Sequence, residues 1–253
     1  MTSARVTGTK RRRRARIAPS AAAADPFAWV CGLLQAGDAF YPTGSYAHSF
    51  GLEGLAQEGV VHDRESLRNF LFLSVLPALR HTDLPLVAQA WRALEKPDWT
   101  RVGEICRLSS ALKTAREARA AAENIGRQRA ELLASLRQDP RAQEYLRLAA
   151  KEGWPFSPSV SAALEGRALG APLEAVLAGV AYASLASLLS AAMKLLRLGQ
   201  NGSQSLLTEA LRAVPPLVAA AQAVSLEDIG WFNPWLDIAA ARHETADGRL
   251  FIS

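Results

Sequence analysis

The sequence predicts an all-α fold, in which a single-domain bundle of about ten helices follows a disordered basic N-terminal tail. Strand signals are nearly absent, because β-branched runs are few and no Asn-Gly turn separates alternating segments. Strong helix formers, Ala, Leu, Arg and Glu, are abundant. A chain of 253 residues with 49% hydrophobic content is also long enough to bury a substantial core.

The basic character of the chain is confined to its first residues. Seven of the 29 Lys and Arg precede Asp25, which leaves the rest of the chain with 22 basic against 24 acidic residues. A block of like charge repels itself, so residues 1–24 are expected to be a disordered extension. Because the folded part has no basic excess, specific nucleic-acid binding is not expected, although the tail could contact polyanions nonspecifically. No convincing signal peptide precedes the body, and the expected location is the cytoplasm.

Helix start and stop signals divide the body. Asp25 followed by Pro26 predicts an N-cap and first helical residue, and Ser157 with Pro158 repeats this pattern. Pro77 should kink or end the helix that Asp63 caps. Helices are expected from about residue 25 to 36, 45 or 48 to 59, 64 to 80, 84 to 95, 99 to 111, 114 to 136, 141 to 151, from 158, 172 to 199, 203 to 213, and after the prolines at 216 and 234.

The helix expected from residue 172 to 199 is unusually apolar. No charge lies between Glu174 and Lys194, over a length close to the roughly 20 residues that cross a bilayer. The run is mostly Ala and Ser, which favours a buried core helix over a membrane span. Small residues recur every fourth position and would let a neighbouring backbone approach closely; they are Gly179, Ala183, Ser187 and Ala191.

The sequence does not support catalysis or metal binding by this chain. Cys31 and Cys106 are too far apart for a Cys-x-x-Cys site. The segment LGQNGSQSL lacks the Gly-Lys-Ser/Thr of a phosphate-binding loop, so Gly199 is interpreted as a helix stop. The histidines lack the i, i+4 spacing of a helical metal pair; they are His48, His62, His81 and His243.

Three segments carry a resemblance to a known family. The first contains Leu34, Gln35, Asp38, Pro42, Gly44, His48, Ser49, Gly51, Leu52 and Glu53. The second contains Lys194, Leu195, Leu198, Gly199, Gln200, Gln204, Leu206 and Leu207. The third contains His243, Glu244, Thr245, Arg249, Leu250, Phe251 and Ser253. In this order and spacing they resemble the urease accessory protein UreF family, with residues 25–253 as a UreF-like all-α domain.

The resemblance implies a protein that forms a homodimer and is not itself an enzyme. It implies binding to UreD, called UreH in some bacteria, and recruitment and regulation of the GTPase UreG, so that the complex inserts nickel into apo-urease. No cofactor is implied for this chain, because UreG holds the GTP. The resemblance also implies partner-binding residues, which are Tyr41, Pro42, His48, Ser49, Glu53, Lys194, Arg197, Gln200, His243, Glu244, Arg249 and Phe251.

Several of these residues allow a structural interpretation beside the functional one. A helix from Ser45 or His48 would place His48 on one side with Leu52, either as a buried histidine or at the partner surface. Glu53 is expected at the surface, in contact with the GTPase. Lys194 could contact UreG or simply complement the helix dipole.

The end of the chain is expected to be ordered against UreD, since Phe251 would otherwise be wet. Aromatic residues before it are expected in the core or a subunit contact; they are Trp231, Phe232 and Trp235. An alternative function is a nickel carrier with Cys31, His48 or His243 as ligands.

Overall fold

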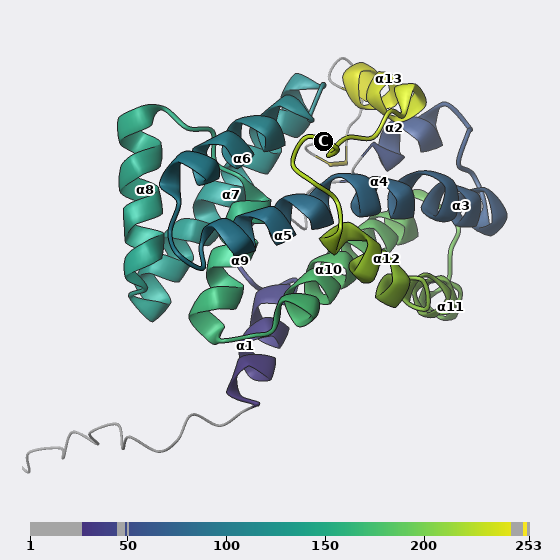
Figure 1. Ribbon diagram of the computed structural model, residues 1–253. Helices are drawn as coiled ribbons and strands as arrows, with labels where there is room; N and C mark the ends of the chain where they lie inside the picture. Colours follow the sequence, from purple (N-terminus) through teal and green to yellow (C-terminus); the bar gives the residue numbers. More distant parts are fainter. Residues whose placement is uncertain (1–26, 45–48, 50, 244–249, 252–253) are drawn as a thin grey trace, which may run out of the picture.

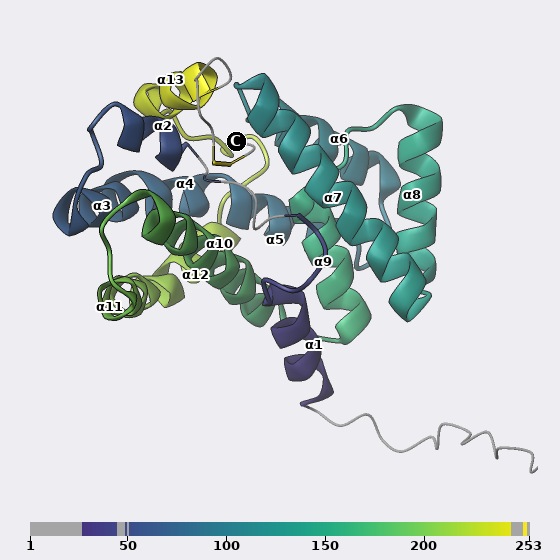
Figure 2. The same cartoon turned by 180° about the vertical axis from the view of Figure 1, so that it is seen from behind.

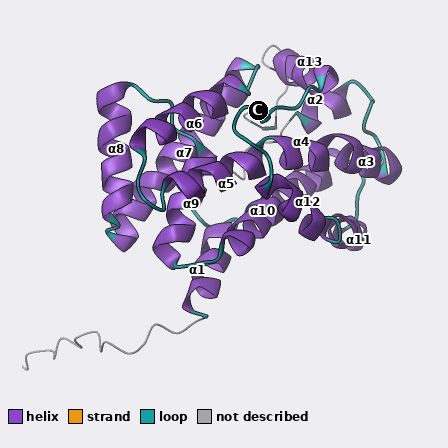
Figure 3. Ribbon diagram, in the orientation of Figure 1, coloured by secondary structure: helices purple, strands orange, loops and turns teal. Residues whose placement is uncertain are grey.

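The computed structural model describes residues 27–44, 49, 51–243 and 250–251. Every regular element in this part of the chain is helical, as predicted (Figure 3). The helices are α1 (Ala28–Gly37), α2 (Leu52–Gln57), α3 (Arg64–Phe70), the π-helical turn η2 (Leu71–Val75), α4 (Leu76–His81), α5 (Asp83–Ala93), α6 (Trp99–Ala111), α7 (Arg116–Arg137), α8 (Pro140–Glu152), α9 (Pro158–Leu169), α10 (Leu173–Leu195), α11 (Gln200–Leu211), α12 (Val214–Gln222) and α13 (Pro234–His243).

The helices surround one core and form two lobes that share α5 and α10. Helices α6, α7, α8 and α9 lie on one side of α5, while α2, α3, α4, α12 and α13 lie toward its other end (Figure 1). Seen from behind, α1 rests at the edge against α9 and α10 (Figure 2). Leu84, Leu164 and Leu177, from α5, α9 and α10, are fully buried in the same cluster. The described part of the chain therefore shares a single hydrophobic core.

Side chains cap several helices at the expected places. Asp63 accepts the backbone N–H of Ser66 at 2.8 Å and forms a capping box with it. Asp98 and Ser157 cap α6 and α9 in the same way. Such caps satisfy N–H groups that have no partner within the helix. The expected cap at Asp25 lies outside the described residues.

The run from α3 to α5 is nearly continuous, although Pro77 lies within it. A π-helical turn precedes the proline, and Leu76 donates its N–H to Leu71 O, five residues earlier. A proline ring cannot fit the regular α-helical ladder, so a wider turn here accommodates it. Pro77 therefore reshapes this helix without ending it.

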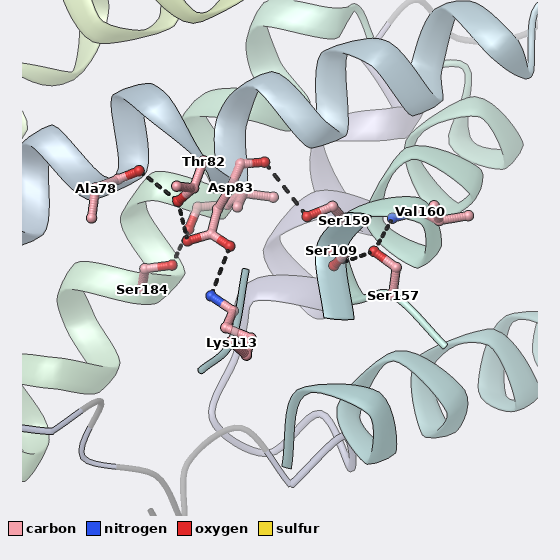
Figure 4. A network of polar contacts seen from close by, with 10 residues as sticks. Ala78, Thr82, Asp83, Ser109, Lys113, Ser157, Ser159, Val160 and Ser184 are labelled. Atoms are coloured by element: carbon pink, nitrogen blue, oxygen red, sulfur yellow. Dashed lines mark hydrogen bonds and ion pairs between the residues drawn. The ribbon is translucent and has the colours of Figure 1, made fainter. Parts of the chain in front are cut away.

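Asp83, the first residue of α5, joins three elements (Figure 4). Lys113 Nζ, from the connection between α6 and α7, lies 3.3 Å from Asp83 Oδ1. Ser159 Oγ, from the first turn of α9, donates to Asp83 O at 3.5 Å. Thr82 Oγ1 donates to Ala78 O at 2.7 Å at the bend between α4 and α5. These polar contacts fix the start of α5 against α4, the connection between α6 and α7, and α9.

Several predicted helix boundaries are wrong, among them the start of α11, which is Gln200 and not residue 203, and the start of α12, which is Val214. The second helix begins at Leu52 and not at Ser45 or His48, because Gly51 adopts a left-handed conformation with φ +81°. The predicted placement of His48 beside Leu52 lies outside the described residues. Helix α10 ends at Leu195, four residues before Gly199, which instead precedes the first residue of α11. In this connection Leu196 has extended backbone, and Leu196 and Leu198 pack against the core.

Helix α10 lines the core, as its composition predicts. Its inner face buries eight residues, among them Leu177, Leu185 and Leu188. By length and apolar composition alone, Leu173–Leu195 and the run Arg64–Ala93 could each cross a membrane, with 44% of each apolar window buried in the fold. Core helices of folded bundles meet the same criterion.

Candidate functional site

Glu53 lies in the first turn of the short helix α2 and points into the protein. Ser49 Oγ accepts the N–H of Glu53 at 3.3 Å, just before the helix begins. Leu52 and Leu55 are buried on the same helix. The Glu53 side chain is only 1% exposed, so its expected position at the surface is wrong. A buried carboxylate requires hydrogen-bond donors, and these come from the other end of the chain.

The two oxygens of Glu53 bind the backbone of the C-terminal segment. Leu250 donates its N–H to Oε1 at 2.7 Å, and Phe251 donates its N–H to Oε2 at 3.1 Å. Hydrogen bonds to an ionised acceptor are shorter and stronger than those between neutral groups. Glu53 therefore fixes the described part of the C-terminus against α2.

Lys194 brings the second motif to the same place. It lies in the last turn of α10, where a cation also complements the helix dipole. Its Nζ lies 5.3 Å from the centroid of the Phe251 ring, within the range of a cation–π contact. Phe251 is only 7% exposed, so it is covered within this chain. We call Ser49, Glu53, Lys194, Leu250 and Phe251 the tail junction.

Helix α13 leads the chain to the tail junction by packing closely on α2. A Cβ on Gly54 would lie 2.8 Å from Ala239 O, and one on Gly51 would lie 2.8 Å from Leu236 Cδ1. Only glycine permits both approaches. The backbones of α2 and α13 therefore approach each other closely at Gly54 and Ala239.

The start of the first motif is held elsewhere, on α7 and α9. Tyr41 Oη donates to Glu165 Oε1 at 2.5 Å, and Arg129 Nε donates to Glu165 Oε2 at 2.7 Å. Burial raises the pKa of Tyr41 well above its usual value, and the hydrogen bond to Glu165 raises it further. The phenol therefore keeps its proton and remains a donor. Next to it Pro42 is exposed, and Gly44 has φ +77°.

The predicted partner-binding residues fall into three groups. Four are exposed, namely Pro42, Lys194, Arg197 and Gln200. Four are buried, namely Tyr41, Ser49, Glu53 and Phe251. His48, Glu244 and Arg249 lie outside the described residues, and so does the side chain of His243, the last residue of α13.

Sequence reasoning missed Arg129 and Glu165. Glu165 had a signal, since it is a charged residue within a stretch of small and apolar residues in α9. Arg129 had none, because α7 carries many arginines.

The aromatic residues at the start of α13 and just before it are not in the core. Phe232 is 82% exposed and Trp235 is 74% exposed, which corrects that part of the expectation. Trp231 is partly exposed and stacks on His81, with ring centroids 5.3 Å apart. A subunit contact for these residues stays a prediction.

The described residues contain no group of three or more His, Cys, Asp or Glu side chains placed to hold a metal ion. Of the suggested nickel ligands, Cys31 is exposed on α1, while His48 and the His243 side chain lie outside the described part. Cys106 is buried, and burial raises the pKa of its thiol to about 11. It therefore stays protonated near neutral pH.

Comparison with known proteins gives a consistent family. A sequence model of the UreF family matches residues 61–211. The urease accessory protein UreF of Corynebacterium efficiens is 30% identical over 220 residues, covering 87% of this chain and 95% of that protein. The urease accessory protein UreF of Bacillus sp. (strain TB-90) is 29% identical over 225 residues, which cover 88% of this chain and 99% of that protein. The urease accessory protein UreF of Granulibacter bethesdensis is 30% identical over 213 residues, which cover 84% of this chain and 89% of that protein. This chain belongs to the UreF family of urease accessory proteins.

Proposed function

We propose that this protein acts in urease maturation as a non-enzymatic scaffold that binds UreD (UreH), recruits the GTPase UreG and regulates it during nickel insertion into apo-urease. Family membership supports the role in maturation. One observation carries the scaffold proposal, which is that three motif segments far apart in the sequence meet at the tail junction. Partner binding at the C-terminus would therefore act directly on Glu53 and Lys194.

The tail junction offers separate surfaces for two partners. Lys194, Arg197 and Gln200 are exposed along the end of α10 and the start of α11, and two of them are cations. This surface suits an acidic patch on UreG. On α13, which packs on α2, Trp235 is exposed, and large exposed aromatics are common binding anchors. We assign this second surface to UreD.

Self-association as a homodimer is part of the proposal. Phe27, just before α1, Leu34 on α1 and Tyr182 on α10 are exposed. A Cβ on Gly179 would meet nothing within 4 Å, so the small-residue stripe is open at this end. Large exposed apolar surfaces favour association, and a two-fold pair is the commonest arrangement. The scaffold itself would hold no nickel or GTP, and would work in the cytoplasm.

The test is size-exclusion chromatography with light scattering on this protein mixed with its cognate UreD and UreG, with GDP or a GTP analogue. The proposal predicts a complex containing all three proteins, with UreG present only when this chain is included. Well-folded partners that never co-elute with this chain under any nucleotide condition would contradict it. Urease activation in a reconstituted system containing nickel and bicarbonate provides the functional readout.

A further inference from the structure

A groove with a volume of about 650 Å³ lies between α4 and α12, which contact each other in the fold (Figure 1). Phe72 and Leu76 form part of one wall, and Leu217 lies in the opposite wall. None of the described residues that line the groove is acidic. A hollow of this size, mostly apolar with a few polar groups, is typical of a binding site. None of its lining residues belongs to the tail junction, so the groove is a separate feature.

The dimensions of the groove suit a helix. Ala213, Leu217 and Ala220 follow one another at intervals of three or four residues along α12, so they share one face of it. The two alanines leave room for a neighbouring backbone. The opposite wall extends from Phe72 to His81, a distance of roughly 14 Å along a helix, or between two and three turns. An amphipathic helix of about three turns, with its apolar face inward, therefore fits between the walls.

Arg80 gives one end of the groove a positive charge. It is exposed, and no hydrogen bond or ion pair joins it to another described residue. Beside it, His81 stacks on Trp231 with ring centroids 5.3 Å apart, and the carbonyl of His81 accepts the N–H of Gly230 at 3.0 Å. These contacts fix the end wall of the groove. An acidic residue on the occupant would complement Arg80 at this end.

The groove is continuous with the surface assigned to UreD. Trp231 lines the groove, and Trp235, four residues later, lines a second hollow of about 330 Å³. Phe72 and Leu73, which are neighbours on η2, line the groove and the second hollow respectively. Phe232, between the two tryptophans, is 82% exposed. Apolar side chains thus connect the groove to Trp235.

The surface assigned to UreG lies at the far end of α11. It includes Gln200, the first residue of α11, whereas the groove begins at Ala213, just after that helix ends. The 12 residues of α11 separate the two by roughly 18 Å. We propose that UreD places an amphipathic helix in the groove, with its apolar face between α4 and α12 and an acidic residue against Arg80. This inference rests on the proposed function, because it adds a contact for the same partner.

Two substitutions test the groove in different ways. Arg80→Glu reverses the charge at its end, and the matched control is Arg107→Glu, at an exposed arginine of α6. Ala220→Trp fills the groove, and its control is Ala111→Trp, at the exposed last residue of α6. Isothermal titration calorimetry of each full-length variant with UreD, at low and high salt, gives the affinities. Circular dichroism establishes that each variant is folded.

Arg80→Glu should weaken UreD binding by about tenfold or more at low salt, and by less at high salt because ions screen the charge. Ala220→Trp should weaken binding by about tenfold or more at both salt concentrations, because the obstruction is steric. Both control variants should bind as the unmodified chain does. Unchanged UreD affinity in either folded groove variant would overturn the inference.

Photocrosslinking identifies the occupant and does not depend on the folding of Ala220→Trp. The probe is p-benzoylphenylalanine in place of Pro216, which is exposed and lines the groove. In a mixture with UreD and UreG, the expected crosslink is to a UreD peptide with an apolar helical pattern and an acidic residue. Crosslinks to UreG or to a second copy of this chain instead, or none, would overturn the inference.

Failure of the proposed function would differ from failure of this inference. In the first case, the unmodified chain would not co-elute with UreD at all, and both would be wrong. In the second case, UreD would bind the unmodified chain and the groove variants equally well.

Discussion

Glu53 and Phe251 lie 198 residues apart in the sequence, and the N–H of Phe251 donates to Glu53 Oε2 at 3.1 Å. The same carboxylate also accepts the N–H of Leu250 at 2.7 Å. Helix α2 and the described C-terminal residues thus depend on one buried side chain. The order of the C-terminus should therefore change when Glu53 is altered, and binding at the C-terminus should act on α2.

Replacing Glu53 with alanine should destabilise the fold. Two backbone N–H groups, from Leu250 and Phe251, would lose their charged acceptor, which is expected to lower the free energy of unfolding by about 2–3 kcal/mol. Urea denaturation measures this change. The control is Glu144→Ala, which breaks the exposed pair with Arg147 and should cost less than about 1 kcal/mol. Equal losses in the two variants would show that Glu53 is no special anchor.

Gly54→Ala should separate α13 from α2. The added Cβ would lie 2.8 Å from Ala239 O, so the helices must move apart, at a cost of about 1–3 kcal/mol. Faster amide exchange in α13, with the rest of the fold protected, is the expected signature. Gly37→Ala is a suitable control, because a Cβ there meets nothing within 4 Å. An unchanged α13 in Gly54→Ala would contradict the close packing.

Stability should fall at alkaline pH. Burial raises the pKa of Cys106 from 9.0 to about 11, and burial also raises the pKa values of Tyr145 and Tyr41. Between these pH values the folded chain keeps protons that the unfolded chain releases. The stability that these groups contribute is therefore fully present below about pH 9 and is lost as the pH rises through about 11. Urea midpoints measured from pH 8 to 11 test this. Cys106→Ala should flatten part of the decline, while Cys31→Ala, at an exposed site, should leave it unchanged.

Tyr182→Arg should convert a homodimer into a monomer. Tyr182 is 45% exposed on α10, and a charge there would remain unpaired in an apolar subunit contact. Light scattering should give about twice the chain mass of 27.2 kDa for the unmodified protein and the single mass for the variant. Leu73→Arg places the same charge on an exposed position of another element, η2, and should remain dimeric. A monomer in the absence of any mutation would exclude the homodimer.

Local signals predicted most helices of the fold. Asp63 and Ser157 are caps whose side chains act within three residues, and Trp99–Ala111 has the predicted bounds, so short-range chemistry determines these boundaries. The start of α2 was predicted wrongly because it depends on the left-handed Gly51, which packs against Leu236 of α13. That contact is invisible to any local pattern.

The candidate site was only partly predictable for the same reason. The motifs indicated Glu53 and Phe251, but nothing local indicated that Glu53 is buried beneath the C-terminal segment. Glu165 and Arg129 lie 36 residues apart, and both are more than 80 residues from Tyr41 in a sequence that gives no pairing signal. Long-range polar contacts of this kind require the folded structure.

The most direct test of the scaffold proposal is the affinity of UreG for the complex of this chain with UreD, comparing Lys194→Ala with the unmodified protein. The control is Lys151→Ala, which removes a lysine paired with Glu152 on the exposed face of α8. The proposal predicts that Lys194→Ala weakens UreG binding by about tenfold or more, with UreD binding retained, whereas Lys151→Ala has no effect. Equal UreG affinity in all three proteins would contradict the assignment of the GTPase surface to the tail junction.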